Sequence, residues 1–304
     1  MRILPIVHHA DYTADTPDGH RFPMRKFAAL AQVLINDGLV PASFHVPEPI
    51  ARDQLILAHT PRYVDGVLQG SLSAPEVRRI GFSLSPSIIR RACLATGGTL
   101  HAARLALVHG LACNSAGGSH HAMADHGAGF CVFNDVAVAA RVLLNEQPDL
   151  KILVIDLDVH QGDGTAAIFA GESRVHTFSM HCDANWPLVK PPSDIDIALP
   201  VGMEDDAYLA ILISTLPKLL SDVSPDFVFY IAGVDPHKED RLGKLNLSDQ
   251  GLMARERFVI DQVRSRQIPL TTVLGGGYST DIDALAARHA LVFHACADYL
   301  ASGR

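Results

Sequence analysis

Short aliphatic runs alternate along this chain with longer amphipathic segments. The runs short enough to be buried strands are Arg2–Val7, Leu111–Asn114, Ile152–Ile155, Arg174–Met180, Asp226–Ala232 and Leu270–Leu274. The segments with helical spacing of apolar residues are Phe22–Asp37, one opened by Ser85-Pro86, Asn134–Gln147, Glu204–Asp222, Ser248–Arg266 and one after Asp281. This alternation predicts an α/β fold with one parallel sheet and helices on both of its faces.

Local signals refine several of these boundaries. Ser85 and Pro86 are typical of a helix start, as N-cap and first helical residue. Gly97-Gly98 inside that helix indicates close packing or a bend. Pro217 predicts that its helix bends or ends there. His59–Tyr63 reads as a turn before a short helix, and the polar, proline-bearing stretch His181–Pro200 reads as a loop.

Polar clusters follow most of the predicted strands. They are Gly117-Gly-Ser-His-His121, Asp156-Leu-Asp-Val-His160, His181, Asp235-Pro-His237 and Gly275-Gly-Gly-Tyr278. Because ligands of parallel α/β sheets bind beyond the carboxyl ends of the strands, we expect these residues to meet at one edge of the sheet. This shared position is the strongest argument from the residues for an active site.

Composition narrows the class of protein. The chain has 304 residues, 48% of them hydrophobic, which suits one large α/β domain. A formal charge of −8 without basic clusters argues against direct nucleic-acid binding. The five cysteines form no CxxC pair, as expected in a reducing cytosol. No run of about 18 apolar residues occurs, so we expect a cytoplasmic protein without a membrane span.

The strand-end residues include a candidate metal site. Asp156, Asp158 and His160 are spaced so that an extended chain would point all three to one side. Asp158, His160 and Asp235 together supply two carboxylates and an imidazole, which suits zinc with an open position for water. The alternatives are a solvated turn with capping aspartates and a competing ligand role for His237, which the proline before it would turn away.

Two histidine pairs differ in setting. His120 and His121 lie in a loop of small residues and could both reach a metal-activated water. Asp156 and Asp163 are suitable partners for their second ring nitrogens, although Asp163 could simply cap a helix after Gly162. His8-His9 has no such setting and reads as a strand-end pair.

Two aromatic residues complete the candidate chemistry. Tyr278 follows three glycines, and a phenol at the sheet edge can donate a hydrogen bond to a developing oxyanion. Phe130 could form the wall of a narrow apolar channel. Without further context, a packed tyrosine in a tight turn and a core phenylalanine explain both residues equally well.

These motifs together resemble the zinc-dependent histone deacetylase family of the arginase/deacetylase superfamily. The matching motifs are Gly117-Gly-Ser-His-His-Ala122, Gly129-Phe-Cys131, Asn134-Asp135, Asp156-Leu-Asp-Val-His-Gln-Gly-Asp-Gly164, Ala232-Gly-Val-Asp235, Asp240-Arg-Leu-Gly243 and Gly275-Gly-Gly-Tyr278. Gln161 and the run Asp240–Leu245 look most like the class IV branch and its bacterial relatives.

The resemblance implies a single catalytic domain over residues 1–304, built on an eight-stranded parallel sheet. It implies zinc on Asp158, His160 and Asp235, and it makes Tyr278 the residue that polarises the substrate carbonyl. It also assigns the active-site histidines and their carboxylate partners, which are His120 with Asp156 and His121 with Asp163.

The resemblance further implies a channel and a second ion. Gly129, Phe130, Leu242 and Gly276 would line an acyl-lysine channel, with Arg25 as the candidate basic residue at its foot. In class I relatives an aromatic wall residue follows the His181 region, which here reads Asn185-Trp-Pro-Leu188. A potassium ion near the zinc would be held by these residues, some through backbone oxygens: Asp156, Asp158, His160, Ser179 and Met180.

We therefore expect a zinc amide hydrolase that removes acyl groups from lysine side chains. The alternatives are a deacylase of small amines such as acetylated polyamines, an arginase-like ureohydrolase with two metals, and a catalytically silent binding protein. The small residues Ala116–Ser119 and Gly129, with the class IV likeness, favour a long acyl chain. If they only let the loop pack closely, the pocket would be acetyl-sized. The sequence leaves the oligomeric state open.

Overall fold

Every predicted aliphatic run forms a strand of one parallel sheet. The computed structural model describes residues 3–303, so Arg2 at the start of the first predicted strand lies outside the described residues. The strands are β1 (Ile6–Val7), β2 (Leu111–Asn114), β3 (Ile152–Asp156), β4 (Val175–Cys182), β5 (Ile195–Leu199), β6 (Phe227–Ile231) and β7 (Leu270–Val273). They pair in the order β1-β2-β7-β6-β3-β4-β5, with every pair parallel.

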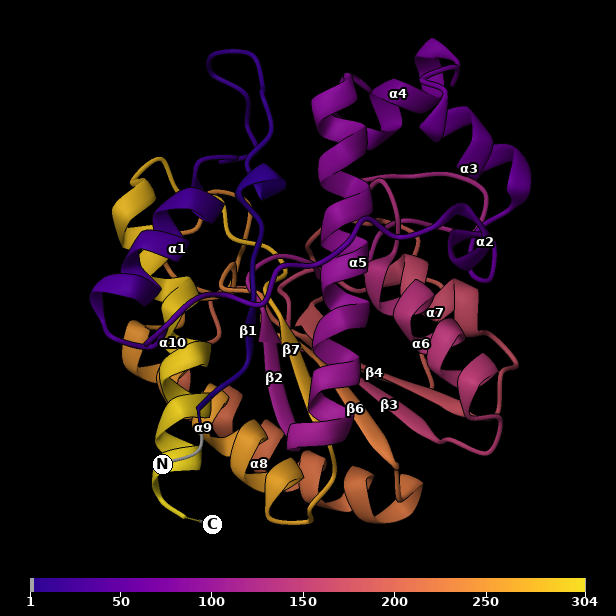
Figure 1. Ribbon diagram of the computed structural model, residues 1–304. Coiled ribbons are helices and arrows are strands. Elements are labelled where there is room, and N and C mark those ends of the chain that lie inside the picture. Colours follow the sequence, from indigo (N-terminus) through magenta and orange to yellow (C-terminus); the bar gives the residue numbers. More distant parts are fainter. Residues whose placement is uncertain (1–2, 304) are drawn as a thin grey trace.

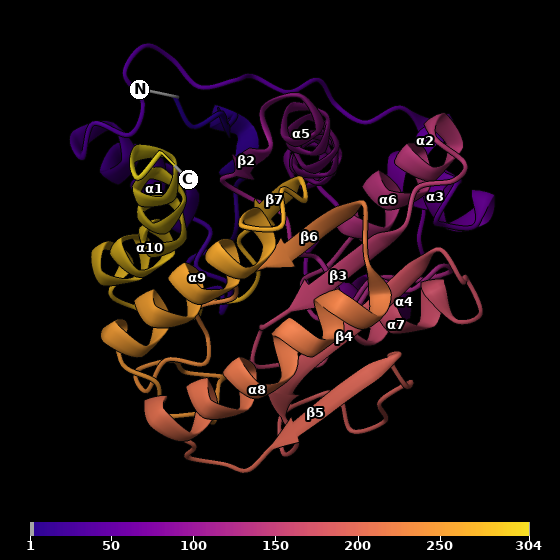
Figure 2. The ribbon, with the colours of Figure 1, turned by 90° about the horizontal axis from the view of Figure 1, so that it is seen from below.

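Helices cover both faces of the sheet, as Figures 1 and 2 show. Along one face, neighbouring helices pack in the order α8 (Asp205–Val223), α9 (Asp249–Arg264), α10 (Ile282–Ala301) and α1 (Lys26–Asn36). The other face is covered by α5 (Pro86–His109), α6 (Asp135–Glu146) and α7 (Asp163–Phe169). Shorter helical turns complete the chain: η1 (Ala10–Tyr12), α2 (Arg52–Leu55), α3 (Pro61–Leu68) and α4 (Ala74–Ile80).

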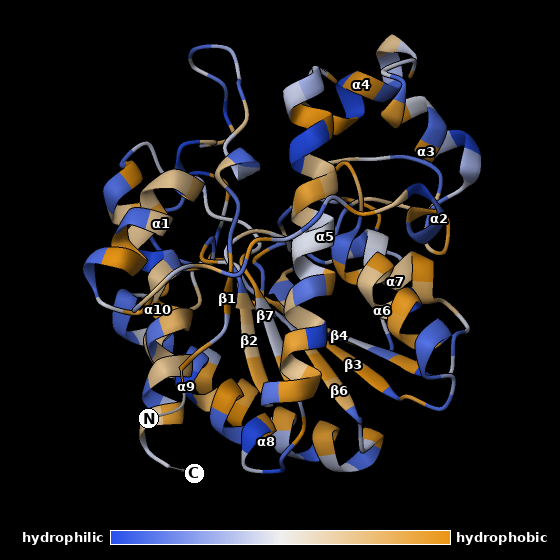
Figure 3. Cartoon of the chain, in the orientation of Figure 1, coloured by the Kyte–Doolittle hydropathy of each residue, from blue (hydrophilic) through white to orange (hydrophobic). Residues whose placement is uncertain are grey.

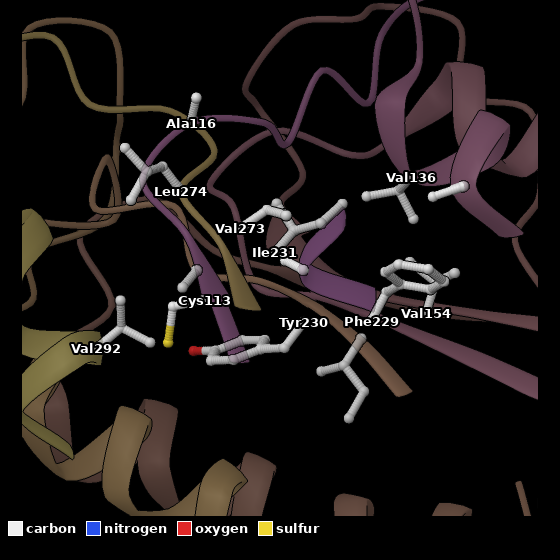
Figure 4. Close-up of a cluster of buried hydrophobic side chains, with 14 of the residues drawn as sticks. Cys113, Ala116, Val136, Val154, Phe229, Tyr230, Ile231, Val273, Leu274 and Val292 are labelled. Atoms are coloured by element: carbon white, nitrogen blue, oxygen red, sulfur yellow. The ribbon is translucent and has the colours of Figure 1, made fainter. Parts of the chain in front are cut away.

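The core lies against the central strands. Val154, Phe229, Ile231 and Val273 come from three neighbouring strands and are each 1% exposed or less. Figure 4 shows them side by side, and Figure 3 shows hydrophobic residues concentrated on the strands. Burial on both faces explains why these strands read as continuous aliphatic runs rather than as alternating patterns.

The start of α5 confirms the predicted cap. Its first residue is Pro86, and the Oγ atom of Ser85 accepts the Ile88 N–H at 3.3 Å. The glycine pair inside this helix marks close packing. A Cβ atom on Gly97 would lie 2.0 Å from the carbonyl oxygen of Glu48, and one on Gly98 would lie 1.9 Å from the hydroxyl of Tyr12.

Two expectations about the fold are wrong, and one of two alternatives is excluded. Residues 3–303 contain a seven-stranded sheet rather than the eight strands that the resemblance implied. The segment read as the loop His181–Pro200 contains strand β5, which lies at the sheet edge and is mostly exposed, so it lacks an aliphatic run. Pro217 does not end its helix, because α8 continues through it to Val223. No helix in the described part of the chain is long and apolar enough to cross a membrane.

Candidate active site

The loops after β3 and β6 bring three ionisable side chains together. One ligand atom from each of Asp158, His160 and Asp235 lies within 4.8 Å of the others. The Nδ1 atom of His160 is 3.0 Å from Oδ1 of Asp158 and 3.1 Å from Oδ2 of Asp235. All three side chains are buried, with at most 7% of any residue exposed. The sequence prediction of this group is therefore confirmed as a spatial cluster.

Backbone N–H groups hold the carboxylates of this cluster in place. Asp158 accepts the N–H of Gly276 through Oδ2 at 2.6 Å and that of His160 through Oδ1 at 3.0 Å. Asp235 accepts the backbone N–H of Val159, in the loop after β3, at 2.9 Å. Strand β3 already ends at Asp156. Asp158 is thus held by a turn in which the aspartate accepts the N–H two residues ahead, and not by continued strand alternation.

The charges in this cluster fit a bound cation. Burial raises the pKa of Asp235, and the charge of Asp158 raises it further. Burial alone would lower the pKa of His160, but the two carboxylates outweigh it and raise that pKa to about 10. The cluster therefore stabilises positive charge between its members. Two carboxylates and one imidazole with an open fourth position are a donor set that suits catalytic zinc.

Two histidine–carboxylate pairs face this cluster. The Nδ1 atom of His120 is 2.7 Å from Oδ2 of Asp156, and that of His121 is 2.6 Å from Oδ1 of Asp163. The two Nε2 atoms lie 3.1 Å apart, and Nε2 of His120 is 3.8 Å from Oδ1 of Asp158. The structure thus makes both predicted pairs. Asp163 is the first residue of α7, but the N-cap is Gly162 and no side-chain cap hydrogen bond is formed there, so the structure supports the pairing and not the capping alternative.

The two histidines differ in electrostatic environment. Burial opposes the imidazolium of His120, but the carboxylates of Asp156 and Asp158 raise its pKa to about 9. Burial and the charge of His120 lower the pKa of His121 to about 4. Near neutral pH, His120 is therefore charged and His121 is neutral. With its Nδ1 proton directed at Asp163, His121 has an unprotonated Nε2, which lies 3.1 Å from Nε2 of His120.

A glycine loop after β7 places Tyr278 beside the cluster. A Cβ atom on Gly276 would lie 1.9 Å from Oδ2 of Asp235, so only glycine allows the loop to approach this closely. Oδ2 of Asp240 accepts the Tyr278 N–H at 2.7 Å and fixes the residue. The Tyr278 ring lies 6.3 Å from that of His160, edge to face. Burial, with the nearby carboxylates, raises the pKa of its phenol well above the usual value, so it stays protonated.

An open cavity of about 400 Å³ leads to these groups. Its lining residues are Arg21, His121, Gly129, Phe130, His160, Asn185, Trp186, Leu242, Lys244 and Tyr278. Gly129, Phe130 and Leu242 therefore line it as expected. Gly276 is not among these lining residues, and its N–H binds Oδ2 of Asp158.

The family comparison agrees with this geometry. Residues 20–294 match the histone deacetylase domain, which is most of the chain. The chain belongs to the histone deacetylase family. It is 48% identical over 296 residues to an uncharacterized protein of Picosynechococcus sp., covering 97% of this chain and 99% of that protein.

More distant relatives match over most of their length. Histone deacetylase 2 of Arabidopsis thaliana is 28% identical, with 85% of this chain and 70% of that protein covered. The acetoin utilization protein AcuC of Staphylococcus aureus is 27% identical, with 86% and 72% covered. The crystal structure of the HDA15 HD domain matches with a TM-score of 0.79 and 22% identity, over 95% of this chain and 88% of that one. This last likeness supports the fold.

Small residues near the site of this family member do not leave empty space. A Cβ atom on Gly117 would lie 2.4 Å from Oδ2 of Asp135, and one on Gly118 would lie 2.4 Å from the backbone nitrogen of Gly275. One on Gly129 would lie 2.8 Å from the His121 ring. These glycines permit close packing, so they give no support to a channel widened for long acyl chains.

Sequence reasoning assigned no role to several residues that shape the site. Trp186 packs edge to face on His121, with ring centroids 4.6 Å apart, and supplies an aromatic wall. Asn185 donates from Nδ2 to the Leu242 carbonyl at 2.8 Å, and the same nitrogen is 3.2 Å from Nε2 of His160. In the sequence, the only signal for an aromatic wall residue here was that Trp186 follows the His181 region.

Three buried bases also escaped prediction. Arg25 is exposed, so it is not the basic residue at the foot of the channel. The adjacent Lys26 is buried instead, with Nζ 3.4 Å from the carbonyls of Gly275 and Gly277. Arg91 lies 5.4 Å from the Phe22 ring, against which Lys26 also packs at 5.2 Å. Helix amphipathicity did not reveal which of two neighbouring bases would face inward.

The third buried base, Arg255, binds the two loops that carry the metal-ligand carboxylates. Arg255 is fully buried and donates to the carbonyls of Leu157 at 3.0 Å and Gly233 at 2.8 Å. Leu157 directly precedes Asp158, and Gly233 lies two positions before Asp235. Arg255 therefore ties together the two loops that carry the carboxylates.

The remaining histidines serve other roles. His237 faces away from the metal cluster, with its Nε2 atom 3.3 Å from Oδ1 of Asp249. His8 is 2.7 Å from the Ser115 hydroxyl through Nδ1, and His9 accepts the Asp11 N–H at 3.0 Å. Neither His8 nor His9 takes part in the site.

The residues named for potassium lie close to the metal cluster. Asp156 and Ser179 are register partners on β3 and β4, so their side chains share a face of the sheet. The Ser179 hydroxyl is 3.0 Å from Nδ1 of His181, and Met180 follows it on the same strand. The carboxylate, hydroxyl and backbone oxygens of these residues are the kind of ligands that a hard monovalent cation prefers.

Proposed function

We propose that this protein is a zinc-dependent amide hydrolase that removes acyl groups from lysine side chains. The observation that supports this best is the arrangement at the cavity floor. Two histidines, each with its own carboxylate, face a three-residue metal-ligand cluster beside a protonated tyrosine. The name of one relative, Histone deacetylase 2 of Arabidopsis thaliana, agrees with the proposed reaction.

The chain's own residues divide the proton transfers. Neutral His121 accepts the proton of the attacking water at Nε2 and later returns it to the leaving amine nitrogen. Asp163 holds the tautomer required for this, because it accepts the Nδ1 proton. Charged His120 stabilises the negative charge that develops on the substrate, and the Tyr278 hydroxyl donates to the carbonyl oxygen.

Asp158, His160 and Asp235 would hold the zinc ion. When bound, zinc supplies Lewis-acid activation of the amide carbonyl and of the attacking water. Potassium would be held by the Asp156 carboxylate, the Ser179 hydroxyl, and backbone oxygens of Asp158, His160 and Met180. We place the reaction in the cytoplasm, on the absence of paired cysteines in the sequence.

A second candidate is hydrolysis of small acylated amines, because the cavity does not by itself distinguish a peptide from a free amine. An arginase-like reaction is less well supported. Within residues 3–303 a single group of at least three candidate metal ligands is found, whereas that reaction uses two metals. Asp235 is followed by Pro236 and His237 rather than by further carboxylates.

The direct test compares substrates on the zinc-loaded protein. An acetyl-lysine peptide, N-acetylated spermidine and free arginine are assayed for release of acetate or urea. The proposal predicts acetate release that is highest with the peptide. Higher kcat/KM on acetylspermidine would favour the small-amine reaction, and urea release would refute the amide hydrolase.

A further inference from the structure

The charged side chains at the cavity mouth are of one sign. Among the residues that line the cavity, Arg21 and Lys244 are the two with a permanent charge, and both are exposed cations. Arg21 belongs to the loop before α1, whereas Lys244 belongs to the loop between β6 and α9. No aspartate or glutamate is among these lining residues. Two separate segments thus contribute positive charge to one opening.

This local charge contrasts with the chain as a whole, whose formal charge is −8. Within the described residues, neither cation makes an ion pair with a carboxylate. Lys244 instead donates from Nζ to the carbonyl of Ala184 at 2.6 Å, in the loop that carries Trp186. The charges at the mouth are therefore left for a ligand.

Two of the carboxylates on the neighbouring loops are engaged elsewhere. Asp240 accepts the backbone N–H groups of Leu242 and Gly243 and is mostly buried. Glu239 pairs with Arg288 on the opposite side of its loop. Asp15, Asp18 and Asp183 lie on these loops too, but none of them lines the cavity.

We infer that Arg21 and Lys244 select acylated amines that carry a carboxylate near the acylated chain. An acyl-lysine enters with its amide at the cavity floor, so its backbone and flanking residues remain at the mouth. There, two cations attract a carboxylate and repel an ammonium group. This inference rests on the proposed function and names its substrate class.

A carboxylate close to the acylated amine can come from two kinds of substrate. One is a protein or peptide with aspartate or glutamate beside the acyl-lysine, and the other is free acyl-lysine with its own carboxylate. A polyamine is the opposite case, because its remaining amines are cationic and would face Arg21 and Lys244. The inference therefore ranks acetylated polyamines as poor substrates.

The experiment measures kcat/KM on zinc-loaded protein for acetyl-lysine peptides that differ only in their flanking residues. Glutamate, glutamine and lysine are placed on both sides of the acetyl-lysine. Free Nε-acetyl-lysine and its carboxamide form a second arm, and N-acetylspermidine a third. Each is assayed at low and high salt, because salt screens exposed charges.

The expected ratio of glutamate-flanked to lysine-flanked peptide is about tenfold, or about 1.4 kcal/mol in transition-state binding. It should shrink at high salt and fall in Arg21→Gln and further in Arg21→Glu. Among residues 3–303, Arg21 makes no hydrogen bond to the Trp186 loop like that of Lys244, so its variants test charge without loosening this loop. Lys218→Gln, at an exposed position on α8, is the matched control and should keep the ratio.

A wild-type ratio near one together with equal kcat/KM on acetyl-lysine and its carboxamide, or a ratio unchanged in Arg21→Glu, would overturn the inference while leaving the hydrolase proposal intact. Preference for acetyl-lysine over its carboxamide, without a flanking effect, would assign the cations to the free amino acid. If no acylated amine is turned over, the proposed function is wrong and the inference fails with it.

Discussion

Replacing Tyr278 by phenylalanine removes one hydroxyl and little else. The ring packs among Phe22, Phe130 and His160, with centroids 6.1 to 6.3 Å away, and phenylalanine keeps these contacts. The backbone N–H of this residue still binds Asp240. We therefore expect Tyr278→Phe to fold normally and to keep the shape of the cavity.

The expected cost follows from what the hydroxyl does. Its raised pKa keeps the phenol protonated near neutral pH, so it is a hydrogen-bond donor throughout the assay range. Removing one oxyanion donor typically costs about 2.7–4 kcal/mol, or about 10²–10³-fold in turnover. Because the metal-ligand cluster does not include Tyr278, the zinc content should stay the same.

The assay compares kcat, zinc content and thermal unfolding of wild type and Tyr278→Phe on an acetyl-lysine peptide. Tyr299→Phe is the matched control, since Tyr299 is buried to a similar extent on α10. It should retain wild-type turnover. Near-full activity of Tyr278→Phe would show that the assigned role is wrong, and a parallel loss of zinc would show that Tyr278 acts through the metal site.

Three further predictions concern the metal, the pH dependence of stability and the acyl chain. Asp158→Ala and Asp235→Ala should each lose both zinc and activity, because each removes one of three ligands; elemental analysis showing full zinc content would contradict the assignment. Burial lowers the pKa of His59 from 6.5 to about 4, so its folded form stays neutral where the unfolded form takes up a proton. Stability should therefore fall by up to about 3 kcal/mol as the pH drops from 6.5 towards 4. Denaturant unfolding of His59→Gln should show a smaller loss of unfolding free energy over that pH window than wild type. The same pH dependence in both proteins would refute the lowered pKa of His59. Because Gly117, Gly118 and Gly129 are closely packed, acetyl-lysine should exceed myristoyl-lysine in kcat/KM by about tenfold, or about 1.4 kcal/mol; the reverse order would restore the long-chain hypothesis.

The sequence predicted what depends on strand position. Buried strands of a parallel sheet leave a clear aliphatic pattern, and their carboxyl ends share one edge, so Asp158, His160 and Asp235 could be grouped without a structure. Asp156 and Asp163 could be named from the residues as suitable partners of His120 and His121, but the pairing itself was implied by the family resemblance. For the metal ligands, a short local pattern determines where the side chain lies.

What failed depends on contacts between distant segments. Strand β5 lies at an edge and is largely exposed, so its residues show no hydrophobic run. Trp186 lies on a loop whose path no periodicity specifies. The choice between Arg25 and Lys26 depends on one helix turn packing against Phe22, which amphipathicity alone does not resolve. The glycines of the site looked like open space in the sequence, but neighbouring backbone and carboxylates fill it.

Zinc titration of the metal-free protein tests the central claim most directly. Chelator-treated protein is supplied with increasing zinc, and acetyl-lysine hydrolysis is measured at each step. One catalytic ion on Asp158, His160 and Asp235 predicts no activity without zinc and full activity at one equivalent per chain. Activity that persists without metal, or that requires two tightly bound ions, would contradict the single-zinc amide hydrolase proposed for this site.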